Sequence, residues 1–177
     1  MTNDTRDGTF ERKEGKTVLR FERHLRHPIE RVWAAITEQD ELVGWLAEAK
    51  VELEPGGRIQ LHWLNTDEEG NRPNEEDIAV MRATITRLDP PHLLEYEGDI
   101  HGLLRWELRE EGAGCVLTFT NATPAPEEYL TKTLAGWHAH LDFLEDALAG
   151  RPITDWPNWP LERWHEHHDR YVAKLGA

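Results

Sequence analysis

The residues that could do chemistry in this chain are concentrated in its last third, and the best-placed pair is His138 and Asp142. These residues are four positions apart, so on a helix they would lie one turn apart and could interact. A His–Asp pair that faces a pocket can serve general acid–base catalysis. On the flank of a helix the same spacing gives an ordinary solvated pair, and this is the interpretation that the sequence favours. His138 and Asp142 are therefore the candidate catalytic residues, without a recognisable catalytic motif around them.

A second cluster of polar side chains lies near the C-terminus. His165, His168 and Asp169 would share one helix face and could hold a divalent metal ion. The sequence identifies no fourth ligand, and an ordinary polar helix face explains the same pattern, so we predict no metal site. The chain also contains none of the glycine-rich, serine-nucleophile or zinc-binding motifs of the common enzyme classes, and we therefore predict no cofactor.

Cys115 is the single cysteine of the chain, which excludes a disulfide within it. A reactive thiolate needs an adjacent base or a helix N-terminus. Cys115 instead opens a predicted strand, so we expect a packed, unreactive thiol. The single cysteine and the polar N-terminal segment, which has no apolar core of a signal peptide, predict a cytoplasmic protein.

The charge balance narrows the classes of partner. The chain has 34 Asp and Glu against 20 Lys and Arg, for a formal net charge of −14. Such a surface repels both the phosphate backbone of nucleic acids and anionic membranes. No stretch reaches the roughly 18 apolar residues of a membrane-spanning helix. We therefore predict neither a nucleic-acid nor a membrane partner.

The candidate catalytic pair must be positioned by a long helix. Large apolar residues recur every three or four positions at Leu130, Leu134, Trp137, Leu141, Leu144 and Leu148. This spacing predicts an amphipathic helix over residues 126–149. Gly150 and Pro152 follow it and are typical of a helix end.

The rest of the chain is typical of a meander of strands. Polar and apolar residues alternate over residues 17–25, which predicts a half-buried strand. Pro28 then opens a short helix, and Thr37 and Asp40 resemble the cap of a second one. Later strand signals cover residues 51–53, 59–63, 78–88, 93–97, 103–109 and 115–121, with an acidic loop at 65–77. The order predicts an α+β fold, in which a curved antiparallel sheet of about seven strands surrounds the long C-terminal helix and two short helices follow the first strand.

Three sequence features carry a resemblance to a known family. They are the segment HPIERVWAAITEQDELVGWL, the Gly56-Gly57 turn and the stretch RLDPPHLLEYE, in this order and followed by the long helix. With them the chain resembles the START-like (SRPBCC) superfamily of START domains, polyketide cyclases and Bet v allergens. Within it, the chain is most similar to the family related to the activator of heat shock protein 90 ATPase. The resemblance implies a helix-grip fold with an internal cavity and, often, a homodimer, but no single activity.

The resemblance covers only the middle of the chain, so we expect three parts. Residues 1–16 are predicted to be a flexible tail, residues 17–150 the helix-grip domain, and residues 151–177 a Trp-rich C-terminal extension with a short helix. The tryptophans of the extension must be buried somewhere, because a large exposed apolar patch is unfavourable in water. We expect the extension to pack over the domain as a lid or to lie in a dimer interface.

A straight helix cannot contact a curved sheet everywhere, so a gap between them could hold a small apolar molecule. Its predicted lining residues are Phe21, Trp63, Trp106, Phe119, Leu134, Trp137, His138 and Leu141. The sequence therefore favours a binding protein for a small hydrophobic or aromatic ligand. Two alternatives stay open: a cyclase- or hydrolase-like enzyme that uses His138 and Asp142, and an interaction protein similar to the co-chaperone.

Overall fold

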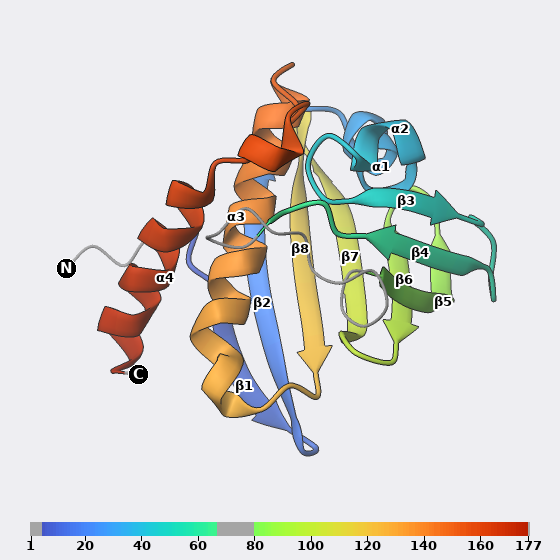
Figure 1. Ribbon diagram of the computed structural model, residues 1–177. Helices are drawn as coiled ribbons and strands as arrows, with labels where there is room; N and C mark the ends of the chain where they lie inside the picture. The colour runs from blue at the N-terminus through green and yellow to red at the C-terminus, as the bar shows by residue number, and fades with distance from the viewer. Residues whose placement is uncertain (1–4, 67–79, 177) are drawn as a thin grey trace.

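The computed structural model describes residues 5–66 and 80–176, and these form one antiparallel sheet with two long helices on one side of it (Figure 1). Within the described ranges the sheet has eight strands in the order β1-β2-β8-β7-β6-β5-β4-β3. The strands are β1 (Thr9–Lys13), β2 (Lys16–Leu25), β3 (Glu48–Val51), β4 (Arg58–His62), β5 (Val80–Asp89), β6 (Leu93–Gly98), β7 (Gly102–Glu111) and β8 (Gly114–Thr123). The predicted α+β helix-grip architecture is confirmed.

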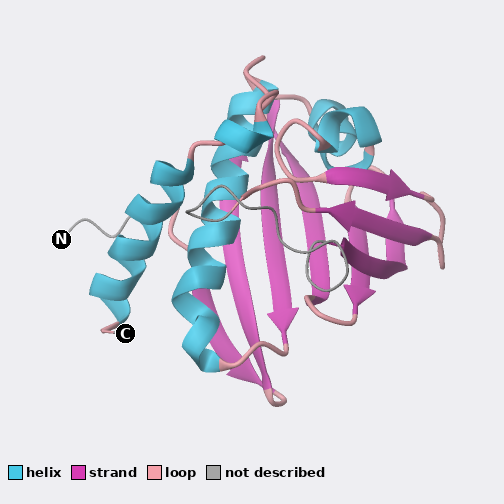
Figure 2. Ribbon diagram, in the orientation of Figure 1, coloured by secondary structure: helices cyan, strands magenta, loops and turns pink. Residues whose placement is uncertain are grey.

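The helices divide into a short pair after the first long strand and a long pair at the C-terminal end (Figure 2). They are α1 (Ile29–Thr37), α2 (Gln39–Leu42), α3 (Leu130–Leu148) and α4 (Leu161–Leu175), with single 3₁₀ turns at Glu127–Tyr129 and Trp156–Asn158. Helix α3 packs against the sheet, and α4 runs beside α3. No helix in the described part of the chain is both long enough and apolar enough to cross a membrane.

The sheet has one strand more than the sequence pattern predicts, because β1 forms inside the segment expected to be a tail. Strand β1 pairs with β2 through a two-residue turn at Glu14 and Gly15, both of which have positive φ angles of 52° and 78°. Two positive φ angles define the hairpin turn whose twist matches that of a sheet. All five residues of β1 are exposed, so the strand has no alternating apolar pattern from which it could have been predicted.

Two further features differ from the sequence prediction, and other predicted features lie outside the described residues. The long helix begins at Leu130, after the 3₁₀ turn, and not directly after Pro126. Thr37 does not cap α2, because its hydroxyl donates to the Trp33 carbonyl oxygen at 2.7 Å within α1. The predicted start of a strand at Ile78, most of the predicted acidic loop and residues 1–4 lie outside the described residues.

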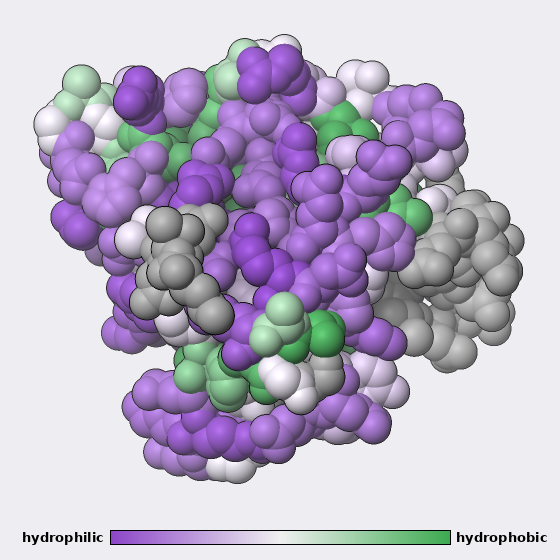
Figure 3. All heavy atoms as spheres, turned by 90° about the vertical axis from the view of Figure 1, so that its left-hand side faces the viewer, coloured by the Kyte–Doolittle hydropathy of each residue, from purple (hydrophilic) through white to green (hydrophobic). Residues whose placement is uncertain are grey.

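The C-terminal extension packs onto the domain. The Trp156 indole N–H donates to the Val43 carbonyl oxygen at 2.8 Å, beside α2. The Trp159 indole N–H donates to the Thr66 carbonyl oxygen at 3.1 Å. Viewed from the α4 side, the surface is mainly hydrophilic with small hydrophobic patches (Figure 3). After these contacts, α4 turns its buried residues, His167 and Tyr171, toward α3, where they contact Asp142 and His138.

Candidate functional site

Two adjoining hollows lie beside α3, where the helix meets the segment after β4 and the C-terminal extension. Their volumes are about 250 Å³ and about 290 Å³, and both are lined by Asn65, Gly136 and His140. We call them the extension-side hollow and the sheet-side hollow. The wall of the extension-side hollow also includes Thr66, Ala139, Trp159, Leu161 and Trp164. The wall of the sheet-side hollow also includes Trp63, His101, Thr133 and Trp137.

Gly136 makes room for both hollows from the middle of α3. A glycine inside a helix is less stable than an alanine by roughly 0.5–1 kcal/mol, because it loses more conformational freedom on folding. Among the described residues, and apart from the neighbouring backbone of α3, a Cβ atom built at Gly136 would meet only the Trp164 indole nitrogen, at 3.9 Å. The space beside Gly136 is therefore open, and a larger residue there would extend into both hollows.

His140 presents a hydrogen-bond acceptor to the hollows. Its Nδ1 lies 2.9 Å from the Trp45 carbonyl oxygen, which can only accept, so Nδ1 carries the proton. In the neutral ring, Nε2 then has a free lone pair. Burial lowers the pKa of His140 to about 4, more than the hydrogen bond to Trp45 raises it. His140 is therefore neutral at physiological pH. Its Nε2 can accept a hydrogen bond, but the ring carries no second proton with which to act as an acid.

Three more polar atoms around the sheet-side hollow lack partners. Trp63 Nε1, Asn65 Oδ1 and His101 Nδ1 are buried and have no hydrogen bond to any described residue. Burial also lowers the pKa of His101, so this ring is neutral at physiological pH. A buried polar atom without a partner costs about 1–3 kcal/mol. These atoms are suited to a ligand that supplies both donors and acceptors.

The predicted lining residues divide between the hollow and the packed core. Trp63 and Trp137 line the sheet-side hollow. The others beneath α3 fill the space in which the gap was predicted: the rings of Trp106 and Phe119 are 4.2 Å apart, and those of Phe119 and Trp137 are 4.5 Å apart. Those packed in the core, each at most 1% exposed, are Phe21, Trp106, Phe119, Leu134 and Leu141. The open space thus lies beside α3 instead of under its centre.

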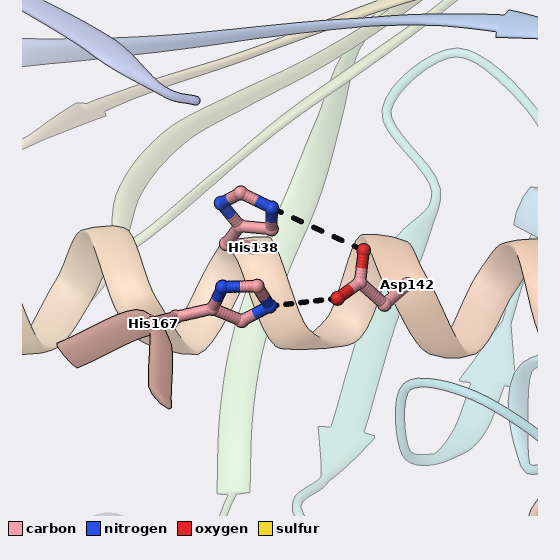
Figure 4. Close-up of side chains that lie close together, drawn as sticks. All are labelled: His138, Asp142 and His167. Carbon is pink, nitrogen blue, oxygen red and sulfur yellow. Dashed lines mark hydrogen bonds and ion pairs between the residues drawn. The ribbon is translucent and has the colours of Figure 1, made fainter. Parts of the chain in front are cut away.

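His138 and Asp142 lie outside the hollows, at the contact between α3 and α4 (Figure 4). His138 is only 2% exposed, so the solvated pair expected from the sequence is wrong. Its Nε2 is 4.0 Å from Asp142 Oδ1, while Asp142 Oδ2 accepts a 2.7 Å hydrogen bond from His167 Nε2 on α4. The rings of His138 and His167 stack with their centres 3.8 Å apart. We call these three residues the interhelix cluster.

Burial and the neighbouring polar groups together determine which side chains of the interhelix cluster are charged. Burial and, to a smaller extent, the neighbouring His167 lower the pKa of His138 to about 3, so His138 is neutral. Burial is the largest single influence on Asp142 and raises its pKa, but the hydrogen bond from His167 and the nearby charges, including Arg6, together outweigh it and hold the pKa of this carboxyl below its usual value. The Tyr171 oxygen lies 2.8 Å from His138 Nδ1 and accepts the Gly8 backbone N–H at 2.8 Å. The cluster is thus enclosed by three segments of the chain.

Sequence reasoning missed His167 and chose its neighbours. His165, His168 and Asp169 do not join the interhelix cluster: the His168 ring stacks on Trp164 at 4.8 Å, and Asp169 is exposed. His167 and Tyr171, four residues apart, are the buried residues of α4. That four-residue spacing indicates one buried face of the helix. Because several histidines lie close together in α4, however, the sequence alone does not say which of them faces α3; only the packing of α4 against α3 decides this. Cys115 is buried and unpaired, and burial raises the pKa of its thiol, as expected for a packed cysteine.

Comparison with known proteins relates most of the chain to one family. Residues 26–149 match the family described as Activator of Hsp90 ATPase homolog 1-like protein. The solution structure of the BPP1335 protein from Bordetella parapertussis is 30% identical, with a TM-score of 0.64, and the match covers 99% of this chain and 96% of that one. The crystal structure of CalU16 from Micromonospora echinospora is 22% identical, with a TM-score of 0.69 and 96% of each chain covered.

DynU16, described as a protein in the dynemicin biosynthetic locus, is 18% identical with a TM-score of 0.59. That match covers 76% of this chain and 48% of the DynU16 chain. No curated protein matches the sequence.

Proposed function

We propose that this protein, which belongs to the Activator of Hsp90 ATPase homolog 1-like family, binds a small aromatic or otherwise hydrophobic molecule in the two hollows beside Gly136. The observation that carries the proposal is the composition of their walls. Ligand sites are typically concave and mostly apolar, with a small number of polar groups that orient the ligand. Tryptophan rings from the segment after β4, α3 and α4 supply the apolar part, and four polar atoms supply the rest.

The tryptophans favour a flat ligand. Trp63 and Trp137 meet edge to face with their centres 6.1 Å apart on the sheet-side hollow, and Trp164 lines the extension-side hollow. Aromatic rings pack well against such walls in stacked or edge-to-face arrangements. A planar ring system would thus bury more apolar surface here than a branched aliphatic molecule of the same volume.

The polar atoms favour a ligand that carries a hydroxyl or carbonyl group. Trp63 Nε1–H can donate to such a group, while Asn65 Oδ1 and His140 Nε2 can accept from it. The biosynthetic context given for DynU16 supports a small organic molecule as the ligand class. A wholly apolar ligand would leave these atoms unpaired and would bind less tightly.

A matched pair of probes tests the proposal. The indole N–H signals of the folded protein would be followed by NMR during titration with 2-naphthol and with naphthalene. We expect saturable shifts of the Trp63 and Trp137 signals, with tighter binding of 2-naphthol. If neither probe moves these signals up to its solubility limit, the proposal is wrong.

Two variants of α3 make the test specific. Gly136→Leu would fill the hollows and abolish the shifts, because its side chain must occupy the open space next to Trp164. Lys132→Leu adds the same side chain to the same helix at an exposed position that lines neither hollow, so it should bind like the wild type. Equal binding by both variants would place the ligand elsewhere.

The two alternatives from the sequence gain less support. An enzyme that uses His138 and Asp142 needs both groups in contact with a ligand, but they lie at the contact between α3 and α4 and line neither hollow. A co-chaperone role follows only from the family name and has no site among the described residues that argues for it. The binding function is therefore the one that the geometry supports best.

A further inference from the structure

We propose that the interhelix cluster binds one divalent transition-metal cation of the Zn²⁺ type, with His138 Nε2, the Asp142 carboxylate and His167 Nε2 as its protein ligands. The ligand atoms of these three residues all lie within 4.8 Å of one another. In Figure 4 both imidazole rings turn a nitrogen toward the same carboxylate, one ring to each oxygen. This proposal is independent of the proposed ligand-binding function.

The distances fit a cation after small side-chain rotations. Zn²⁺ lies about 2.0–2.2 Å from nitrogen and carboxylate ligands in a tetrahedral site, so neighbouring ligand atoms are roughly 3.3 Å apart. In the cluster His167 Nε2 lies 2.7 Å from Asp142 Oδ2, and His138 Nε2 lies 4.0 Å from the other oxygen, Oδ1. A bound cation requires the His167–Asp142 contact to lengthen and the His138–Asp142 contact to shorten, which rotation of the carboxylate and of the two rings can supply.

The chemical types of the three ligand atoms determine which cations the cluster would prefer. Two imidazole nitrogens and one carboxylate suit Zn²⁺, Co²⁺ and Ni²⁺, whereas Mg²⁺ and Ca²⁺ require mainly oxygen ligands. Metal-binding histidines usually hold their second ring nitrogen in a hydrogen bond that orients the ring. Tyr171 supplies this contact for His138, because its oxygen lies 2.8 Å from Nδ1. With a cation bound, Nδ1–H donates to this oxygen, and the Nε2 lone pair faces the metal.

Two arginines near the cluster oppose the binding of a cation, whereas the carboxylate of Glu145 favours it. Arg6 Nη2 lies 3.2 Å from Asp142 Oδ1, and the buried Arg23 lies close by, with its Nε 3.4 Å from Glu145 Oε1. Glu145 also accepts a 2.7 Å hydrogen bond from Arg6, so it can hold this guanidinium when Asp142 turns to the metal. The cation therefore competes with Arg6 for one carboxylate oxygen, and the proton on His167 Nε2 moves to Nδ1 so that the neutral ring offers its Nε2 lone pair to the metal.

A cation in this place would tie the C-terminal extension to the domain. His138 and Asp142 belong to α3, whereas His167 belongs to α4. Trp164, three residues before His167, lines the extension-side hollow. A metal bond from α4 to α3 would therefore fix one wall of that hollow.

The test uses the full chain without an affinity tag, freed of metal by chelation and dialysis. We expect calorimetric titration with Zn²⁺ to show one saturable site, and Co²⁺ to develop the visible absorption of a tetrahedral complex. His167→Gln and Asp142→Asn should each weaken Zn²⁺ binding by more than the roughly 10- to 100-fold that loss of an outer contact costs. Arg6→Gln should strengthen it, because the competing cation is removed.

The double variant His165→Gln/His168→Gln is the matched control, since it removes two histidines of the same helix that lie outside the cluster. It should bind Zn²⁺ like the wild type. Absence of a saturable site in the folded wild-type chain, or loss of binding in this double variant alone, would overturn the proposal.

Thermal unfolding of each metal-free variant shows whether it is folded. Zn²⁺ should raise the Tm of the wild type but not that of His167→Gln. Should both cluster variants fail to fold, X-ray absorption of the Zn²⁺-loaded wild type decides the matter, because only coordination by two imidazoles agrees with the proposed site.

Discussion

The Nδ1–H group of His140, on α3, donates a 2.9 Å hydrogen bond to the backbone carbonyl oxygen of Trp45, just after α2. This bond joins residues that are 95 positions apart and fixes the tautomer that turns an acceptor toward the hollows. It therefore connects the stability of the domain to its proposed ligand site.

His140→Phe keeps an aromatic ring but leaves the Trp45 carbonyl without this donor. We expect a loss of about 1–3 kcal/mol in the free energy of unfolding. Urea denaturation measures it, and an unchanged midpoint would show that the bond is unimportant.

Gly136→Ala should make the protein more stable. Among the residues that the structure describes, and apart from the adjoining backbone of α3, the added methyl group meets only the Trp164 indole nitrogen, at an ordinary contact distance of 3.9 Å. Alanine is favoured over glycine inside a helix by roughly 0.5–1 kcal/mol, and the gain should appear in full in urea denaturation. A decrease in stability would mean that the space beside Gly136 is smaller than described.

Two Trp→Phe substitutions separate a bonded indole from an unbonded one. The Trp106 N–H donates to the Tyr96 oxygen at 3.0 Å, whereas the Trp63 N–H has no partner among the described residues. Trp106→Phe should therefore cost about 1–3 kcal/mol more than Trp63→Phe. Trp63→Phe should instead reduce the preference for 2-naphthol over naphthalene. Equal losses of stability in the two variants would contradict the assignment of Trp63 as an unsatisfied donor.

Tyr171→Phe tests how the N-terminal segment and the two long helices are held together. The Tyr171 oxygen contacts both the Gly8 backbone N–H and His138 Nδ1, each at 2.8 Å. Removing the oxygen leaves a buried N–H unpaired, so we expect a loss of about 1–3 kcal/mol. Hydrogen exchange should become faster at Gly8 and along α4 and stay unchanged in β6 and β7. Uniform acceleration over the whole sheet would argue for a global effect only.

The stability of the protein should depend on pH partly through His101. Burial lowers the pKa of His101 in the folded chain, whereas the unfolded chain has the ordinary value near 6.5. Below about pH 6.5 the unfolded state therefore binds more protons, and stability falls as the pH falls. His101→Gln lacks this contribution, so the wild type should lose stability relative to it between about pH 7 and pH 5. Parallel stability profiles for the two proteins would rule out the buried neutral ring.

The short-range patterns of the sequence predicted most of the fold. The apolar spacing around Trp137 predicted α3, and the alternation from Thr17 predicted β2, because helices and strands repeat at 3.6 and 2 residues whatever lies against them. The alternation also places Arg23 on the same face as Phe21, and the structure buries it there. Strand β1 was missed because its turn, at Glu14 and Gly15, has no flanking apolar pattern.

The candidate site depended on docking, which no local pattern contains. The sequence alone determined that α3 carries His138 and Asp142 one turn apart and that tryptophans are numerous around it. Only the tertiary structure decided that His167, and not His165 or His168, meets Asp142, because a shift of one residue in α4 turns a side chain by about 100°. It also decided that Trp106 is core whereas Trp63 lines a hollow, since how far a gap is filled depends on the summed volumes of side chains from distant strands.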